Sequence, residues 1–451
     1  MPRVRFLAIA GALLASTTAS AQTAAPERLY LANDDHTDYF WALDDVGYRQ
    51  AFQDMISFYL DQADSSASNA VDARGRFNLD GALWVYEWEH NQPAAQMDRL
   101  MAHVAAGDIS LQLHSLVLLG GAMPTEAVLR DMMYAGRLER RYPVHVDMAV
   151  MMENQTLAGG LASLWAGAGA KYSWRGICDC ATALSSPGDR DREIYTFAGH
   201  DGQSVLMKWN SLVSNNQSIG GYAEAFDPSG AVNVMENDAG YRARMPFPVK
   251  AAFGFGWDAP ETETDAFITA AQTLGDEAHE IIVSNEHDFF EDFSASVNVA
   301  TDVPLFVGSH GNEWDLLTAS LAKPSAQMRR SMAKLRAAEG LSVIVANADP
   351  SFLTGRFDGT DDARELAQLH MGMFYDHDWT ADSPIAGMHD ARAQFERDTA
   401  DQVSAYVDAL ESDAVARLAQ LVPAVPGRQR FLVANPVAAF VPAVVELPGI
   451  S

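Results

Sequence analysis

Strand-like and helix-like hydrophobic patterns alternate along the chain from about residue 28 to Pro304, and this alternation constrains the fold most. Residues 28–33 alternate apolar and polar side chains as a half-buried strand does, and residues 52–59 then carry apolar side chains at helical spacing. Further strand-like stretches lie at residues 83–88, 109–119, 143–150 and 249–253. Strands separated by helices indicate an α/β fold with a largely parallel sheet.

The pattern changes after Pro304. Residues 313–341 and 391–421 each place apolar side chains on one helical face. Two long amphipathic helices need partners for these faces, so this part of the chain is predicted to form a helical bundle. The strand-like residues 430–433 then begin a different segment.

A cleavable signal peptide is predicted at residues 1–21. Two arginines precede a short apolar stretch, and the small residues Ala19, Ser20 and Ala21 form a cleavage site of the Ala-x-Ala type. The apolar stretch is shorter than the roughly 20 residues that a membrane-spanning helix needs, and no later segment reaches that length. We therefore expect a periplasmic or secreted protein that is not embedded in a membrane.

Charge and motif content exclude several classes of function. The formal net charge is -29, from 31 basic and 60 acidic residues, and such a surface repels phosphate backbones, so nucleic acid is not an expected partner. The sequence has no GxxxxGK[ST], GxSxG or HExxH motif, which removes the commonest nucleotide-binding, serine-esterase and zinc-protease interpretations. Its two cysteines, Cys178 and Cys180, fit either a labile disulfide or buried thiols.

Residues suited to bind a metal follow two of the predicted strands. His36 and Asp38 come after the first strand, and Glu153 comes after residues 144–150. Ligands in α/β sheets bind at the carboxyl ends of strands, and imidazole and carboxylate groups hold divalent ions. Simpler interpretations stay open: a surface turn for His36 and Asp38, and an acid at a helix N-terminus for Glu153. Asp147, on the strand itself, is an alternative ligand.

Two more clusters carry suitable side chains. Residues 249–253 run into a glycine-containing turn with Trp257, an apolar wall for a sugar ring, and Asp258, a proton donor if its pKa is raised. An ordinary turn fits there as well. His377 and Asp378 lie between the two long helical segments, where a solvated connection is the alternative interpretation.

The order and wording of these segments resemble glycoside hydrolase family 38, the α-mannosidase family, over about residues 28–440, as in a divergent, exported bacterial member that is short at its C-terminal end. His36 to Trp41 is similar to the opening His-x-Asp segment of the family, and Trp84 to Trp88 and Gly107 are similar to its second and third strands. Residues 153–172 have the family's spacing from the nucleophile to a Gly-x-Lys-Tyr strand. Gly256 to Asp258 resembles the segment that carries the acid, and His377-Asp378 resembles a His-Asp pair of the family.

The resemblance implies a domain organisation. Residues 26–305 would form an α/β catalytic domain with a seven-stranded, barrel-like parallel sheet. Residues 306–424 would form a three-helix bundle, and residues 425–451 the start of a truncated, β-rich C-terminal region.

It also implies a zinc-dependent, retaining glycosidase that acts on α-linked mannose or a related sugar. Its zinc ligands would be His36, Asp38, Glu153 and His377. Glu153 would be the nucleophile, Asp258 the acid and Arg175 a support for the nucleophile, while Trp41, Trp257 and Asp378 would bind the substrate.

Glu153 departs from the family, which has aspartate at the position of the nucleophile. The glutamate carboxylate reaches about one methylene further, and catalytic geometry tolerates such shifts poorly. Two other functions therefore stay open: a relative that binds carbohydrate or metal with impaired turnover, and a different periplasmic metallohydrolase. Sugar identity, linkage and oligomeric state do not follow from the sequence.

Overall fold

The structure is a computed structural model, which describes residues 25–153, 156–176, 192–210, 221–256, 261–311, 313–354, 362–379, 383 and 385–436. Strands and helices alternate in it as far as residue 306, and only helices follow. The α/β class and the change to helices alone near Pro304 are thereby confirmed. The domain boundaries at residues 305 and 424 stay predictions.

The strands of the described residues form three sheets. A parallel sheet has the order β8-β1-β9, with β8 at Val249–Phe253, β1 at Glu27–Ala32 and β9 at His279–Ser284. A second sheet has the order β10-β6-β7-β5-β4, at Leu305–Phe306, Ile194–Ala198, Ser204–Asn210, Tyr172–Gly176 and Met148–Val150, with only β6 and β7 antiparallel. A short parallel pair joins β2 at Phe77–Asn78 to β3 at Ile109–Ser110. The seven-stranded, barrel-like sheet is not confirmed.

The middle strand β1 shows why the first sheet forms. Its residues Leu29 to Ala32 are buried on both faces, as expected of a central parallel strand with an almost continuous apolar run. The helices that contact this sheet are α7 (Pro228–Asn237), α9 (Ala266–Leu274) and α10 (His287–Ser296). The carboxyl ends of all three strands lie at the same edge, where the chain continues into polar loops.

Other helices surround the sheets. They are α1 (Asp45–Ser66), α2 (Ala82–Asn91), α3 (Ala94–Ala106), α4 (Thr125–Asp131), α5 (Met133–Arg141), α6 (Leu161–Ala168), α8 (Ala239–Arg244) and α11 (Val299–Asp302), with a short 3-10 turn, η1, at Val71–Ala73. The helix predicted around residues 52–59 is confirmed as α1, whose Phe52, Met55 and Ile56 are buried.

Two of the predicted strands are wrong, and a third is much shorter than predicted. Residues 83–88 belong to helix α2, and because this stretch is buried on every side its apolar run looks the same as that of a buried strand. Within residues 109–119 only β3 is a strand. Residues 430–433 form no strand in the described part of the chain, and Leu432 and Val433 are exposed.

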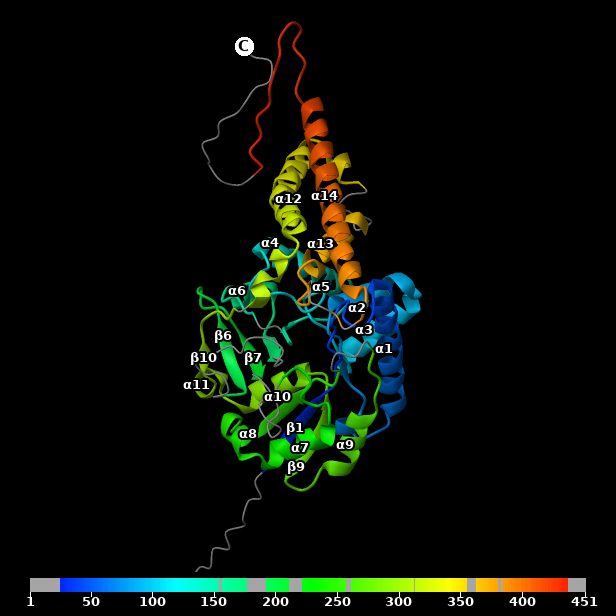
Figure 1. The fold of residues 1–451 in the computed structure, drawn as a ribbon, viewed down its shortest axis with the longest axis vertical. Coiled ribbons are helices and arrows are strands. Elements are labelled where there is room, and N and C mark those ends of the chain that lie inside the picture. The colour runs from blue at the N-terminus through cyan, green and yellow to red at the C-terminus, as the bar shows by residue number, and fades with distance from the viewer. Residues whose placement is uncertain are drawn as a thin grey trace, which may run out of the picture.

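The C-terminal helices include a long pair, α12 (Ala322–Ala348) and α14 (Met388–Gln420), which pack side by side and project from the α/β body (Figure 1). Two 3-10 helices flank α12, η2 at Glu313–Ala319 and η3 at Pro350–Leu353. The third helix, α13 (Asp362–Met373), packs against α4 and α5 as well as α14. The three-helix bundle is thus not confirmed as such, because α13 is anchored in the body of the protein.

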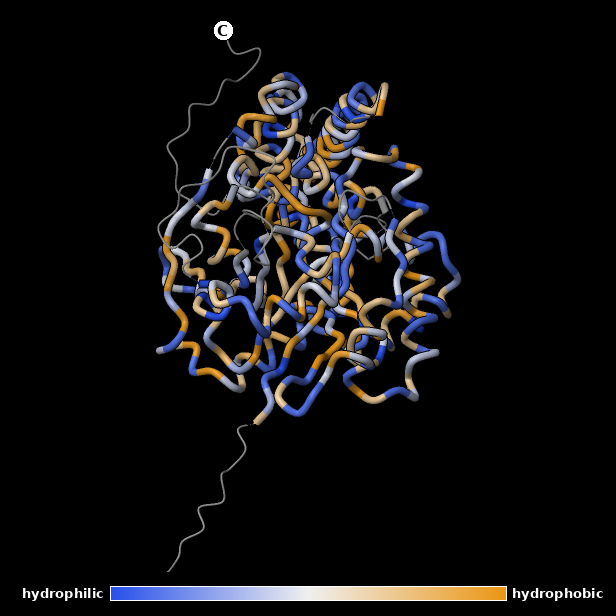
Figure 2. Tube along the Cα trace, turned by 60° about the horizontal axis from the view of Figure 1, so that its bottom comes forward, coloured by the Kyte–Doolittle hydropathy of each residue, from blue (hydrophilic) through white to orange (hydrophobic). Residues whose placement is uncertain are grey.

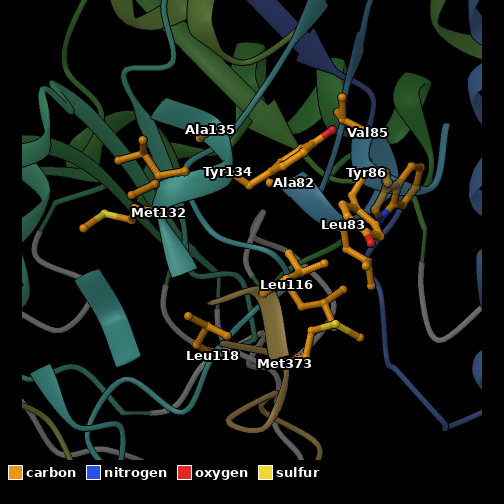
Figure 3. Packing of buried hydrophobic residues seen from close by; sticks show 14 of the residues in the cluster. Ala82, Leu83, Val85, Tyr86, Leu116, Leu118, Met132, Tyr134, Ala135 and Met373 are labelled. Carbon is orange, nitrogen blue, oxygen red and sulfur yellow. The ribbon is translucent and has the colours of Figure 1, made fainter. Parts of the chain in front are cut away.

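Hydrophobic segments gather inside the body and hydrophilic ones at its periphery (Figure 2). The largest buried cluster also includes side chains of α12, α13 and α14, so the core of the body continues into the helical part. Met373, at the end of α13, lies beside Leu116 and Leu118 in Figure 3 and belongs to the same buried cluster as side chains of α2 and α5. No helix in the described part of the chain combines the length and the apolar character that crossing a bilayer requires.

Candidate metal centre

The loop after β1 carries His36 and Asp38 in a fully buried setting. Between them, the backbone N–H of Thr37 donates to Asp80 Oδ2 at 2.8 Å, and Trp84 Nε1 donates to Thr37 Oγ1 at 3.2 Å. Asp80 and Trp84 belong to the region of β2 and α2. This region therefore fixes the backbone between the two candidate ligands.

Glu153 comes from the other sheet, three residues beyond β4. The N–H of Met151 donates to the carbonyl of Trp174 at 2.8 Å, so the chain still follows β5 when it approaches Glu153. Glu153 has φ of 55°, in the left-handed region that a non-glycine residue rarely adopts. Such backbone strain concentrates at functional sites, where the surrounding structure holds it in place.

His377 lies between α13 and α14 and is held by the backbone. Its N–H donates to the carbonyl of Val117 at 3.0 Å, and the N–H of Leu119 donates to the carbonyl of Tyr375 at 2.7 Å. Met373, which packs in the core, is only four residues earlier in the chain.

These three segments bring His36, Asp38, Glu153 and His377 together. His36 Nε2 lies 2.9 Å from Asp38 Oδ1 and 2.7 Å from Glu153 Oε2. His377 Nε2 lies 3.3 Å from Asp38 Oδ1 and 3.6 Å from Glu153 Oε2. One ligand atom from each side chain lies within 4.8 Å of all the others, and all four residues are buried.

The geometry fits a divalent cation. Zinc–ligand bonds of about 2.0–2.1 Å place the corners of a tetrahedron about 3.3 Å apart, which is close to the spacings found here. Two imidazole nitrogens and two carboxylate oxygens are a donor set that zinc accepts. Only small adjustments of these side chains would be needed to hold an ion.

Charge complementarity links the two kinds of ligand. Burial lowers the pKa of His36, but Asp38 and Glu153 raise it by more, so the pKa is well above the ordinary value. Burial raises the pKa of Asp38, but the two histidines lower it by more. The imidazole and carboxylate groups therefore attract one another, and a divalent cation would replace the protons of the imidazoles.

The loop that carries His36 and Asp38 also contains, and lies against, other buried carboxyl groups. Burial raises the pKa of Asp34 to about 7 and also raises those of Asp35 and Asp80. Phe255 N–H donates to Asp34 Oδ1 at 3.1 Å, which ties this carboxyl group to the end of β8. The electrostatic environment at the carboxyl ends of the strands thus favours cations and protons.

Asp378 lies beside the cluster. It is buried, and burial together with the charge of Asp38 raises its pKa to about 8. Arg392 Nη2 lies 3.7 Å from its Oδ2. Trp41, half-buried, closes the turn after Asp38 with a 2.9 Å hydrogen bond from its N–H to the carbonyl of that residue.

Arg175 is at the end of β5, the strand next to the one that precedes Glu153. Its side chain is fully buried, with the guanidinium carbon 4.4 Å from the centre of the Trp209 ring.

Asp147 is not with the cluster: its carboxylate lies 2.9 Å from His287 Nε2 and 3.0 Å from Lys171 Nζ. The alternative assignment of Asp147 as a ligand is therefore wrong for this cluster. Trp257, Asp258 and the two cysteines lie outside the described residues.

Four residues near the cluster were missed by the sequence analysis. The Tyr222 ring lies 4.5 Å from that of His36, and the Trp314 ring lies 5.9 Å from that of His377. Asp376 and Arg392 form a hydrogen-bonded chain behind His377. Only the position of Asp376 next to His377 gave a signal in the sequence, because the other contacts join distant segments.

Comparison of the sequence with models of protein families and with curated proteins gives no match. Among solved structures, the fold is similar to an α-mannosidase from Enterococcus faecalis V583, with a TM-score of 0.65 and 15% identity over 87% of this chain and 43% of that one. A protein in glycosyl hydrolase family 38 from Enterococcus faecalis gives a TM-score of 0.54 and 15% identity over 88% and 40%. The chain thus spans less than half the length of either neighbour. Its fold is similar to that of family 38, as the sequence resemblance implied.

Proposed function

We propose that the protein is an exported glycoside hydrolase of the α-mannosidase type, zinc-dependent and active on α-linked mannose or a related sugar. The observation that carries the proposal is the buried cluster of His36, Asp38, Glu153 and His377, on a fold similar to that of an α-mannosidase. Export rests on the predicted signal peptide, which lies outside the described residues.

In this proposal the imidazole Nε2 atoms of His36 and His377 and the carboxylates of Asp38 and Glu153 hold the zinc. When bound, zinc supplies a Lewis acid that binds neighbouring sugar hydroxyls and thereby selects the ring and its distortion. The buried position of the ligands excludes bulk water, which strengthens the electrostatic interactions inside the site.

Glu153 is the proposed nucleophile. Its carboxylate would attack the anomeric carbon while a second carboxyl group, roughly 5 Å away, protonates the leaving oxygen. Asp258 is the proposed acid, and Arg175 would stabilise negative charge from the same edge of the sheet. Asp378 would bind sugar hydroxyls through its carboxyl group, and Trp41 would bind a ring face.

The test is hydrolysis of an aryl α-mannoside by the purified protein, with and without a chelator and added zinc. We expect turnover that the chelator abolishes and zinc restores. Glu153→Gln should lose turnover, whereas Glu411→Gln, on the far part of α14 and paired with Lys334, should keep it. A fluorinated sugar that traps the covalent intermediate should label Glu153; a label on another residue would refute this assignment.

The second candidate is a relative that binds zinc or sugar but turns over little or no substrate. The observation that favours it is Glu153 itself, whose longer side chain stands on a strained backbone at the proposed position of the nucleophile. Stoichiometric zinc and measurable sugar binding without hydrolysis would support this candidate. Zinc-dependent cleavage of another kind of bond would instead identify a different metallohydrolase.

A further inference from the structure

A buried arginine from the long helix α14 reaches the candidate metal centre. Arg392 is 2% exposed, although it is the kind of residue that normally stays in water. Its Nη2 donates to Asp376 Oδ1 at 2.9 Å. A buried charge requires a partner, and Asp376, whose side chain is equally buried, supplies it.

Asp376 passes this interaction on to His377. Its other oxygen, Oδ2, lies 3.2 Å from His377 Nδ1. A carboxylate beside an arginine can only accept a hydrogen bond, so Nδ1 donates, and Nε2 is the nitrogen that faces Asp38 and Glu153. A histidine that binds a metal through one nitrogen normally donates the other N–H to a group such as this carboxylate.

Arg392 also lies near Asp378, itself a candidate site residue, and near Phe40, which follows the candidate ligand Asp38 in the chain. Its Nη2 lies 3.7 Å from Asp378 Oδ2, and its guanidinium carbon lies 5.8 Å from the centre of the Phe40 ring, two residues after Asp38. The planar, forked guanidinium group suits such simultaneous contacts better than the point charge of a lysine. One residue of α14 therefore touches the segments on both sides of the cluster.

A stabilising role alone explains this arrangement poorly. A buried ion pair contributes little to stability compared with apolar side chains of the same volume, since the cost of desolvation offsets the attraction. The same helix carries an ordinary ion pair further along, between Arg417 and Asp349, whose arginine is 40% exposed. Of these two arginines, the buried one is Arg392, which lies near the cluster.

We propose that Arg392 is a positioning residue of the metal centre, which acts through Asp376 to fix the ring orientation and the metal-binding nitrogen of His377. The inference rests on the proposed function, because it takes His377 as a zinc ligand. It assigns a role to α14, which lies in the helical part of the chain.

The test compares zinc affinity, measured by competition with a chromogenic chelator, in four proteins. Arg392→Met, which keeps the apolar stem, should weaken zinc binding about 10- to 100-fold. Arg392→Lys should recover part of this loss. Arg417→Met, the matched control on the same helix, should bind zinc within about twofold of the unchanged protein. Unchanged affinity in a folded Arg392→Met variant would overturn the proposal.

A second variant and a second measurement keep the test decisive. If Arg392→Met does not fold, Asp376→Asn, which keeps the shape of the side chain, decides in its place, and unchanged zinc affinity there overturns the proposal. If the unchanged protein binds no zinc, the proposed function fails, and the inference is judged by crystallography of the zinc-free variants. A rotated His377 ring in Arg392→Met or Asp376→Asn then supports the positioning role, and an unmoved ring overturns it.

Discussion

Replacement of Gly254 by alanine should destabilise the protein and disturb the metal centre together. Gly254 follows β8 with φ of 85°, and its N–H donates to the carbonyl of Ala32, at the end of β1, at 3.2 Å. A Cβ atom at this position would lie 2.0 Å from the carbonyl oxygen of Tyr222 and 2.9 Å from the Trp174 ring. Because the Tyr222 ring lies 4.5 Å from the His36 ring, any shift of Tyr222 reaches a candidate ligand.

The expected loss has two parts. Left-handed backbone costs a residue with a Cβ atom about 1–2 kcal/mol. Relief of the contact with Tyr222 requires a movement of the backbone, and overpacking of this kind costs about 1–3 kcal/mol. Gly202 provides the matched control, because its φ is 83° and a Cβ atom there would meet nothing within 4 Å. Gly202→Ala should therefore lose only the first part.

Urea unfolding, followed by tryptophan fluorescence, measures the difference between the two variants. We expect Gly254→Ala to be less stable than Gly202→Ala by about 1–3 kcal/mol. We also expect weaker zinc binding in Gly254→Ala alone. Equal losses of stability, with zinc affinity unchanged in both variants, would refute the argument that close packing at the end of β8 supports the site.

Three other predictions follow from the charges. His36→Ala and His377→Ala should each lose the bound zinc, as measured by elemental analysis, and stoichiometric zinc in both variants would contradict the assignment of these ligands. Lys208 Nζ lies 2.5 Å from Glu224 Oε2, with both side chains fully buried. Removal of the lysine leaves a buried charge without a partner, so Lys208→Met should cost about 3–5 kcal/mol of unfolding free energy at pH 8. Lys334→Met, at an ion pair near the surface, should cost less than about 1 kcal/mol, and a similar loss in both variants would contradict the reasoning. Burial raises the pKa of Glu224 to about 7, above its ordinary value of 4.5. The folded protein thus favours the protonated form, and the stability from this group is complete below pH 4.5 and is lost as the pH rises through about 7. Glu224→Gln should flatten this part of the stability profile of the zinc-free protein, and an unchanged slope would count against it.

Strands β1 and β8 of the first sheet could be predicted from the sequence with bounds within one residue. The apolar runs of β1 and β8 are short and end at polar or glycine residues, which strands of a buried parallel sheet require. The apolar run at residues 83–88 was wrongly predicted to be a strand, because a helix buried on every side lacks the polar face that distinguishes it from a strand. The number of strands in each sheet depends on pairings between distant segments. The periodicity within one segment gives no information about these pairings.

Some residues of the candidate site could likewise be predicted from the sequence, and others could not. The order of the motifs along the chain was enough to select His36, Asp38, Glu153 and His377, which the structure brings together. The position of Asp147 against His287 and Lys171, by contrast, depends on contacts across the fold. Arg392 was missed because a charged residue on a long amphipathic helix is normally exposed, and its burial depends on Asp376 from another segment.

Anomalous X-ray scattering at the zinc absorption edge, from crystals grown with zinc, tests the central claim most directly. We expect one strong peak between His36, Asp38, Glu153 and His377, at about 2.0–2.2 Å from one atom of each side chain. A crystal that shows no peak there, with the two histidines at hydrogen-bond distance from the two carboxylates, would contradict this assignment.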